Sequence, residues 1–305
     1  MLTQAEKAYA KINFYLDVIG KREDGFHNIE SVMQTVSLYD TLNVSYMTSK
    51  TREVELIVSF DGISEELSSG EDNLACRAAR LYLDRRNIFS KIKLELIKRI
   101  PIAAGLGGGS ADAAAALRAL NRIFGAYTQE ELLSLAGELG SDVPFCLFGG
   151  TAFCEGKGER IRRVSYPGGD VKLHFVIAAP CAKVSTPEAY AELDEIYGDF
   201  VDKEREDVLA DFNKFISAVK LGIKPKKPLY NVFERSRASF GPESERAKSV
   251  LLKTGALVAL MTGSGPACFG VFDIKSKAES AKIALTADGI RAWYAEGVSG
   301  ISEDF

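Results

Sequence analysis

The chain has 305 residues, 46% of them hydrophobic and 26% charged, with a formal net charge of −4 and a pI near 5.5. These values are ordinary for a globular protein, and the length is sufficient for a large core and two lobes. A nucleic-acid-binding protein normally carries a basic excess, so the composition argues against a nucleic-acid partner. The short basic run at 224–227 is interpreted as a solvated loop.

Targeting and cysteine signals are weak. The first ten residues lack the apolar core of a signal peptide, and no apolar run of about 18 residues predicts a membrane span, so we expect a cytoplasmic protein without a membrane partner. No cysteine pair has C-x-x-C spacing, and only two histidines are present, so neither a zinc site nor a disulfide framework is predicted. The five cysteines are Cys76, Cys146, Cys154, Cys181 and Cys268.

The first half of the chain is predicted to form four extended segments and three helices. Alternating polar and apolar residues at 91–98, KIKLELIK, are typical of a half-buried strand. Thr128 is a good N-cap for a helix at 129–139, and Asp72 or Asn73 for one at 74–86. The other strands are expected at 8–19, 31–46 and 54–60, and the other helix follows a glycine cluster.

The second half is predicted to alternate helices and strands. The closing order of helix, two strands, helix and strand favours an α+β sandwich with an antiparallel sheet. We expect a lobe boundary near residue 158, which gives an N-terminal lobe at 1–158 and a C-terminal lobe at 159–305. Strands are expected at 171–179, 257–261, 268–272 and 291–295, and helices at 186–190 with Thr186 as cap, at 203–219, before Gly255, and at 276–286.

The glycine cluster Gly105–Gly109 predicts an anion site. Glycines allow the backbone to lie close to a ligand, and the alanine-rich segment after them is a strong helix former. With Ser110 as N-cap and Asp112 in the first turn, the loop leads directly into a helix N-terminus. The unpaired backbone N–H groups of the loop and of this helix end form a site that suits phosphate. A flexible surface loop is the alternative, and Leu106 and the capped helix argue against it.

Two common phosphate motifs do not fit this cluster. No lysine follows Gly109, so the loop is not a Walker A motif. No acidic residue follows at the distance that a dinucleotide fold requires. The residues therefore indicate a phosphate or nucleotide held by backbone groups, without identifying which.

Lys11 and Asp142 are candidate reactive groups. Lys11 lies inside an apolar strand, where a lysine is rarely buried unless it is paired, and an edge-strand lysine that reaches solvent is an equal alternative. Asp142 is followed by Val143 and Pro144, and an aspartate that caps a turn at a helix end is an equal alternative. Near a phosphate-binding helix, such a pair would form a phosphoryl-transfer site.

Two further clusters are weaker when each is taken alone. Phe26 and His27 at a loop tip offer a stacking ring and a hydrogen-bonding ring, which suit a planar base, although a loop histidine is more often structural. The second glycine cluster, Gly263–Gly265, lies between two strands and fits a tight hairpin as well as a ligand loop.

Taken in order, these motifs resemble the GHMP kinase superfamily. The resemblance covers residues from about 5 to 297 and rests on A-K-I-N, D-G-F-H, the glycine loop, D-V-P and G-S-G, beginning at Ala10, Asp24, Gly105, Asp142 and Gly263. The glycine loop is specific only for ATP-dependent phosphorylation. The other motifs, with G-S-D-V-P-F and E-G-x-G-E, resemble the branch that phosphorylates the 2-hydroxyl of a CDP-linked methylerythritol in non-mevalonate isoprenoid synthesis.

The resemblance implies a two-lobed α+β fold, ATP and Mg²⁺ as cofactors, a small-molecule substrate, and a monomer or weak homodimer. It implies that Asp142 is the catalytic acid–base residue with Lys11 beside it, and that Ser110 is a possible metal ligand. The implied substrate residues are Asn13 for the methylerythritol part, His27 for the cytosine edge, Phe26 and Tyr190 for its two faces, and Thr186 beside them. The implied ATP residues are Asn73 near the adenine, Pro101, Ala104, Gly105, Leu106, Gly107, Gly108, Gly109, Ser110, Gly263, Ser264 and Gly265.

The sequence departs from the family pattern at four positions, and two rival functions remain. Phe26 and Tyr190 exchange the expected tyrosine and phenylalanine, Ser141 replaces alanine, and Ala111 replaces serine. One rival is a superfamily kinase for a smaller alcohol such as homoserine or mevalonate, which should lack the aromatic–His–aromatic set. The other is a catalytically silent nucleotide-binding regulator, against which the presence of both candidate reactive residues argues.

Overall fold

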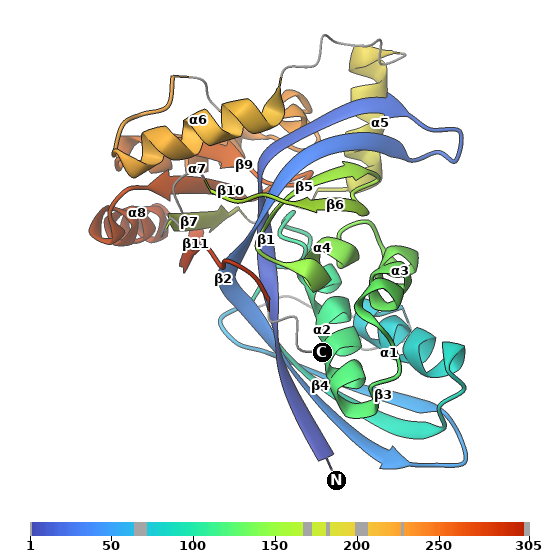
Figure 1. The fold of residues 1–305 in the computed structure, drawn as a ribbon. Coiled ribbons are helices and arrows are strands. Elements are labelled where there is room, and N and C mark those ends of the chain that lie inside the picture. Colours follow the sequence, from blue (N-terminus) through green and yellow to red (C-terminus); the bar gives the residue numbers. More distant parts are fainter. Residues whose placement is uncertain are drawn as a thin grey trace.

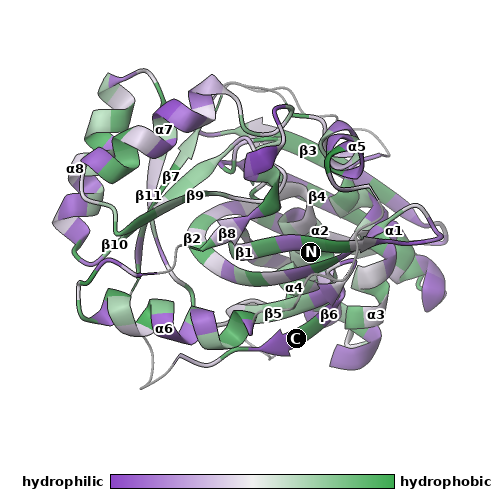
Figure 2. Ribbon diagram, turned by 90° about the horizontal axis from the view of Figure 1, so that it is seen from above, coloured by the Kyte–Doolittle hydropathy of each residue, from purple (hydrophilic) through white to green (hydrophobic). Residues whose placement is uncertain are grey.

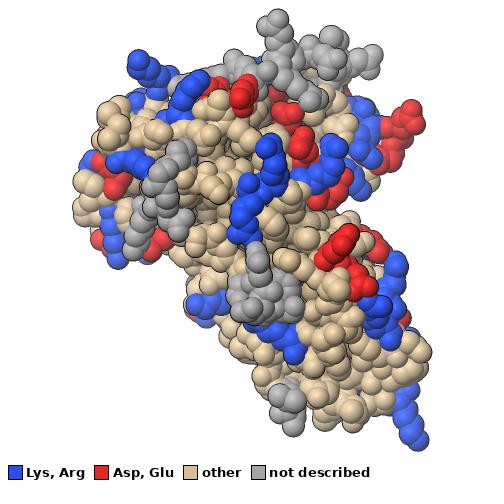
Figure 3. Space-filling view, in the orientation of Figure 1, with Lys and Arg blue, Asp and Glu red and all other residues tan. Residues whose placement is uncertain are grey.

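The protein folds into two sheets, and a long central hairpin of the first sheet packs against the second (Figure 1). The computed structural model describes residues 2–63, 72–166, 173–180, 184–198, 207–226 and 229–301. Within these ranges no helix combines the length and the apolar character that a membrane span requires. On the face shown in Figure 3, acidic and basic side chains are interspersed.

The first sheet is built around the strands β1 (Leu2–Lys21) and β2 (His27–Thr48), which pair antiparallel along nearly their whole length. Its path is β3-β4-β2-β1-β8, and β5 joins β2 while β6 joins β5. The other strands are β3 (Glu53–Phe60), β4 (Ser90–Lys98), β5 (Thr151–Gly156), β6 (Arg160–Arg163) and β8 (Tyr230–Asn231).

Helices cover one face of this sheet because the strands alternate between buried and partly exposed side chains, as β4 does along its whole length. The helix α2 (Gly108–Phe124) lies nearest to β1, and its buried alanines allow close approach to the sheet. Around it pack α1 (Leu74–Arg85), α3 (Gln129–Leu139) and α4 (Val143–Phe148).

The second sheet has the antiparallel order β11-β7-β10-β9 and is covered on both faces. Its strands are β7 (His174–Ala179), β9 (Val258–Met261), β10 (Cys268–Phe272) and β11 (Arg291–Glu296). Seen from above in Figure 2, it lies between α6 (Val208–Lys220) and the pair α7 (Pro242–Lys253) and α8 (Lys275–Ala287). The helix α5 (Thr186–Tyr197) and the short 3-10 turn η1 (Val232–Arg235) complete this half.

The ring of Phe14 joins the two halves. Phe14 lies on β1, and its ring centroid is 5.8 Å from that of Phe175 on β7 and 6.0 Å from that of Phe269 on β10. Rings of α6 close the cluster, with Phe212 at 5.3 Å and Phe215 at 5.6 Å. These rings are fully buried, so the long central strand belongs to both cores.

The α+β class with an antiparallel second sheet is confirmed, and most predicted elements exist. The predicted caps Asn73 and Thr128 are observed, and Thr128 forms a complete capping box with Glu131. The strands β5, β6 and β8 and the short helix α4 were not predicted. Because β6 and β8 both belong to the first sheet, the chain returns to that sheet after residue 158, and the division into lobes at 1–158 and 159–305 stays a prediction.

Two cap assignments are wrong. α2 begins at Gly108 with Gly107 in the left-handed N-cap position, so Ser110 is part of the first turn and does not cap it. α5 is capped by Ser185, whose hydroxyl accepts from Glu188 N, and Thr186 is the first helical residue instead. The first residues of the segments expected at 171–179 and 203–219, together with Cys181, lie outside the described residues.

We had expected Asp112 in the first turn of α2, but it lies beyond that turn and forms a buried ionic trio. Lys98 donates to Asp112 Oδ2 at 2.7 Å and also binds Asp40, and all three side chains are at most 2% exposed. Burial raises the pKa of Asp112 to about 8, in spite of the opposing charge of Lys98. With Asp112 protonated, one ammonium faces one carboxylate, so the trio beneath α2 is nearly neutral.

The pKa of Asp112 makes stability depend on pH. Because this pKa lies above the ordinary value of 3.8, the folded chain binds more protons than the unfolded chain between the two values, and the free energy of unfolding falls as pH rises. Between about pH 5 and pH 8, we expect the free energy of unfolding of Asp112→Asn to fall by about 1 kcal/mol or more less than that of the unmodified protein. Urea unfolding at several pH values measures it, with the exposed Asp61→Asn as control. Parallel profiles for Asp112→Asn and the unmodified protein would contradict the assignment.

Candidate active site

A single cavity of about 630 Å³ brings together residues from both halves of the chain. Its volume lies in the usual range for a small-molecule site. The predicted site residues that line it are Lys11, Asn13, Phe26, His27, Gly105, Gly107, Ser110, Asp142, Thr186, Tyr190, Gly263, Ser264 and Gly265.

Six residues predicted for ATP do not line this cavity. The side chain of Asn73 caps α1 by accepting from Ala75 N at 2.9 Å. Leu106 is buried, and its carbonyl accepts from Lys11 N at 3.0 Å, while the carbonyl of Ala104 accepts from Ala267 N at 3.2 Å. The others are Pro101, Gly108 and Gly109. Part of the glycine loop is therefore hydrogen-bonded to the rest of the protein. Contact of these six residues with ATP stays a prediction.

The two glycine clusters pack directly against each other. Gly105 has a φ of +80°, and a Cβ built on it would lie 2.3 Å from the carbonyl oxygen of Thr262, so only glycine fits there. A Cβ built on Gly263 would in turn lie 2.7 Å from the carbonyl oxygen of Gly105. The second cluster does connect β9 and β10, as the hairpin alternative required, and it also forms one wall of the cavity.

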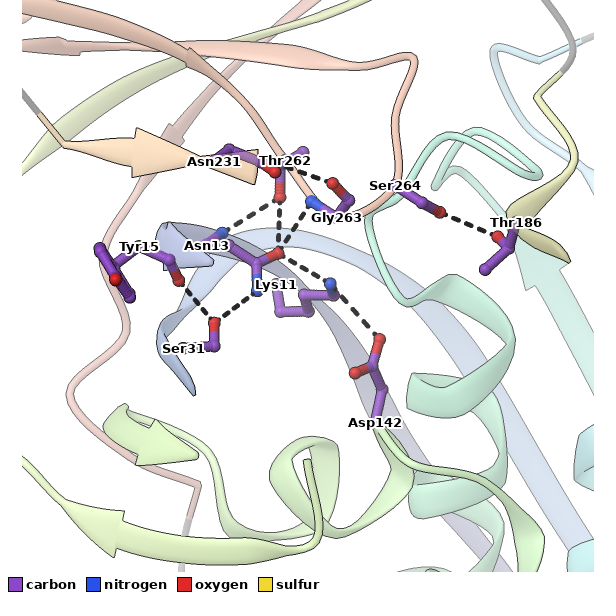
Figure 4. A network of polar contacts seen from close by, with 10 residues as sticks. All are labelled: Lys11, Asn13, Tyr15, Ser31, Asp142, Thr186, Asn231, Thr262, Gly263 and Ser264. Carbon is purple, nitrogen blue, oxygen red and sulfur yellow. Dashed lines mark hydrogen bonds and ion pairs between the residues drawn. The ribbon is translucent and has the colours of Figure 1, made fainter. Parts of the chain in front are cut away.

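Lys11 is a buried, paired lysine. Its side chain is 4% exposed, and Nζ lies 3.4 Å from Asp142 Oδ2 and donates to Asn13 Oδ1 at 2.9 Å (Figure 4). The register between β1 and β2 shifts just before Lys11 and again after Asn13, and such irregularities re-aim side chains. The alternative of an edge-strand lysine in solvent is therefore wrong.

Asn13 is the centre of a hydrogen-bond network (Figure 4). Its Oδ1 accepts from Lys11, from Thr262 Oγ1 at 3.1 Å and from Gly263 N at 2.9 Å, while its Nδ2 donates to Ser31 at 2.8 Å. The amide is therefore held by protein groups and orients Lys11, and the expected contact of Asn13 with the methylerythritol part stays a prediction.

Residues that sequence reasoning missed complete this network. Asn231 Nδ2 donates to the carbonyls of Met261 and Gly263, both at 2.9 Å, and so fixes the second glycine loop. No motif marked Asn231, and Thr262 was given no role although it lies in the run 261–266 that contains the second glycine cluster, because their partners are distant in sequence.

Asp142 occupies the N-cap position of α4 without a capping hydrogen bond from its side chain. It is 30% exposed, and the carboxylate faces Lys11 instead of the helix backbone. The alternative of a turn-capping aspartate therefore does not describe it. Pro144 in the first turn of α4 fixes the backbone that presents it.

The far end of the cavity carries aromatic and charged groups. The ring of His27 stacks on Tyr190, with centroids 4.7 Å apart, and Phe233 meets Tyr190 edge-on at 4.9 Å. Phe26 is 53% exposed, with Lys157 Nζ 4.8 Å from its ring centroid. The expected sandwich of a base between Phe26 and Tyr190 differs from this arrangement, because His27 covers one face of Tyr190.

Asp194 is a further cavity residue that the sequence analysis missed. One carboxylate oxygen lies 2.7 Å from His27 Nε2 and the other 2.6 Å from Lys21 Nζ. Burial opposes ionisation, but the hydrogen bonds from Lys21 and His27 outweigh it and hold the pKa of Asp194 below its usual value. The spacing of Thr186, Tyr190 and Asp194, each four residues apart on α5, was a signal for one helix face.

Comparison with known proteins gives the same family along the chain. Residues 73–150 match the model of the GHMP kinases N terminal domain, and residues 222–291 match GHMP kinases C terminal. A curated 4-diphosphocytidyl-2-C-methyl-D-erythritol kinase of Caldicellulosiruptor saccharolyticus is 43% identical over 270 residues, which cover 87% of each chain. The protein of that name from Clostridium botulinum is 37% identical over 296 residues, covering 95% of this chain and 96% of the relative.

Solved structures agree with this result. A crystal structure of 4-(cytidine 5'-diphospho)-2C-methyl-D-erythritol kinase matches with a TM-score of 0.77 and 33% identity, covering 98% of this chain and 100% of the other. Homoserine kinase from Cytophaga hutchinsonii matches with a TM-score of 0.67 and 20% identity over 97% of this chain and 95% of the other, which shows the shared fold alone. The chain therefore belongs to the GHMP kinase family, in the group of the 4-diphosphocytidyl-2-C-methyl-D-erythritol kinases.

Proposed function

We propose that this GHMP kinase transfers the γ-phosphoryl group of ATP to the 2-hydroxyl of 4-diphosphocytidyl-2-C-methyl-D-erythritol. The observation that carries the proposal is one cavity in which the buried Lys11, its partner Asp142 and the glycine loops lie at one end and His27 and Tyr190 at the other. A substrate with a reactive alcohol and a distant planar base fits both ends. The names of the relatives support the same substrate.

The chemistry follows from the Lys11–Asp142 geometry. Asp142 accepts the proton of the substrate hydroxyl and orients its oxygen, which forms a bond to the γ-phosphorus as the bond to the leaving oxygen of ADP breaks. The ammonium of Lys11, 3.4 Å from Asp142, offsets the negative charge on the transferred group. Because such transition states are largely dissociative, orientation by Asp142 contributes as much as early proton removal.

The ATP end of the cavity suits phosphates held by backbone groups and a metal ion. Gly107 and Gly108 open α2, so their N–H groups and the positive helix end face anionic oxygens. Within the described ranges no group of three His, Cys, Asp or Glu side chains is placed to hold a metal. Mg²⁺ would therefore be bound mainly by phosphates and water, with the Ser110 hydroxyl as the protein ligand, and when bound it neutralises phosphate charge.

The base end distinguishes this substrate from small alcohols. Phe26 offers an exposed ring and His27 a hydrogen-bonding ring, and the Thr186 hydroxyl connects their side of the cavity to the second glycine loop through a bond to Ser264 Oγ at 2.8 Å. Homoserine and mevalonate have no base for these groups to contact. The shared fold of a homoserine kinase does not make that distinction, because it lies in the side chains and not in the backbone.

A direct test offers the purified protein Mg-ATP with the CDP-linked methylerythritol, homoserine or mevalonate, and measures ADP release. We expect turnover with the cytidine compound alone, because only that compound fills both ends of the cavity. Turnover with a small alcohol would keep the phosphoryl-transfer chemistry and overturn the base site.

Asp142→Asn tests the reactive end. We expect kcat to fall about 10²–10⁴-fold, because the amide cannot accept the hydroxyl proton, with little change in the unfolding transition. Exposed Asp84→Asn is the matched control and should retain full turnover. Near-normal turnover of Asp142→Asn would remove Asp142 from the mechanism.

His27→Ala tests the base end. We expect KM for the cytidine substrate to rise about tenfold or more while KM for ATP stays within about twofold, since the change removes base contacts and not chemistry. Steady-state kinetics with each substrate varied in turn measure both values. A rise in KM for ATP alone would mean that the two ends of the cavity have been assigned in reverse.

A further inference from the structure

Asp194 is a charged group in the cavity for which the phosphoryl-transfer chemistry has no use. It lies on α5, and its two oxygens have different partners on the β1–β2 hairpin, with Lys21 at 2.6 Å and His27 Nε2 at 2.7 Å. The His27 side chain is 7% exposed and stacks on Tyr190, so the ring has a fixed plane as well as a fixed partner.

The contact with Asp194 determines the position of a proton on His27. An ionised carboxylate only accepts hydrogen bonds, so Nε2 must carry the hydrogen that it donates. In a neutral imidazole the proton position on one nitrogen follows from the hydrogen bond made by the other. Lys21 binds the second oxygen and, with His27, holds the pKa of Asp194 below its usual value, but an aspartate with an ordinary pKa is already ionised at neutral pH, so the His27 contact does not depend on Lys21.

We propose that Asp194 is a positioning residue that fixes the plane and proton position of His27 and so sets the preference of the site for a cytidine over a uridine substrate. The inference rests on the proposed function for its substrate. Cytosine and uracil differ by an exchange of donors and acceptors at ring positions 3 and 4. If the His27 imidazole has one nitrogen fixed as donor and the other fixed as acceptor, it distinguishes cytosine from uracil. An imidazole that can move its proton between the two nitrogens matches either base.

The first experiment is Asp194→Asn. In this variant Lys21 attracts the amide oxygen, so the amide NH₂ faces Nε2 and favours the tautomer that lacks a proton there. We expect KM for the CDP-linked methylerythritol to rise, kcat to change less than KM, and the kcat/KM ratio between this compound and its UDP-linked counterpart to fall about tenfold or more. An unchanged ratio would overturn the proposal.

The second experiment observes the imidazole directly. The chain has only two histidines, so ¹⁵N labelling of histidine gives two sets of ring signals, and a His174→Gln variant assigns them. We expect a protonated Nε2 at His27 in the unmodified protein and loss of that signature in Asp194→Asn. An unprotonated Nε2 in the unmodified protein would overturn the proposal, whether or not the enzyme turns over any substrate.

Two control variants separate positioning from docking of the hairpin. Glu195→Gln removes a neighbouring exposed charge on α5 and should leave the substrate preference and the ring signals unchanged. Lys21→Met breaks the other ion pair to the same carboxylate but leaves the His27 contact in place. If Lys21→Met lowers the cytidine preference as much as Asp194→Asn does, the contact holds the hairpin and does not set specificity.

Failure of the inference and failure of the proposed function give different results. If the unmodified protein does not phosphorylate the cytidine compound, the proposed function fails, and the ¹⁵N signals still test the positioning of His27. Calorimetric binding of cytidine diphosphate and uridine diphosphate then measures the preference without catalysis. If the unmodified protein is active and Asp194→Asn keeps its preference, only the inference fails.

Discussion

The amide oxygen of Asn13 is the contact on which the site depends. It accepts at once from the Lys11 ammonium, from Thr262 and from the backbone of Gly263, so a single atom ties the reactive lysine to the second glycine loop. Buried donors that lose their acceptor cost about 1–3 kcal/mol each, which makes this arrangement expensive to break. The loops add a steric constraint, because the Gly105 backbone leaves no room for a Cβ beside Thr262. The position of Lys11 is thus determined by segments from both halves of the chain.

The first sheet supplies the rigid support for this contact. β1 passes through both cores, and its register shifts on either side of Lys11 and Asn13, which turns these two residues toward the cavity. Beneath the opening of α2, the Lys98 trio fixes the helix that presents Gly107 and Ser110. A Cβ on Gly108 would lie 3.4 Å from Lys98 Nζ, so the buried ammonium lies directly under the first turn of α2. Rigid elements of this kind position reacting groups better than loops do.

The two ends of the cavity use opposite electrostatic designs. At the reactive end, Lys11 faces Asp142, which is partly exposed, so solvent and substrate reach the carboxylate while the ammonium stays buried. At the base end, Asp194 is shared between Lys21 and His27, and its low pKa keeps it an acceptor. The first arrangement leaves a carboxylate able to receive a proton, and the second holds a proton in place on a ring. Both follow from how many cations each carboxylate meets and how much water reaches it.

The sequence by itself determined features that depend on local order. Most strands and helices, the Thr128 cap, the phosphate-type glycine loop and the motifs that contain Lys11, Asp142 and His27 could be read from neighbouring residues, since hydrophobic period and backbone freedom are local properties. The tertiary structure decided what each polar group does. It moved the start of α2 to Gly108, and it brought Asn13, Thr262 and Asn231 together across more than 200 residues. Hydrogen-bond partners and burial depend on segments that meet only in the folded chain, and no local pattern encodes them.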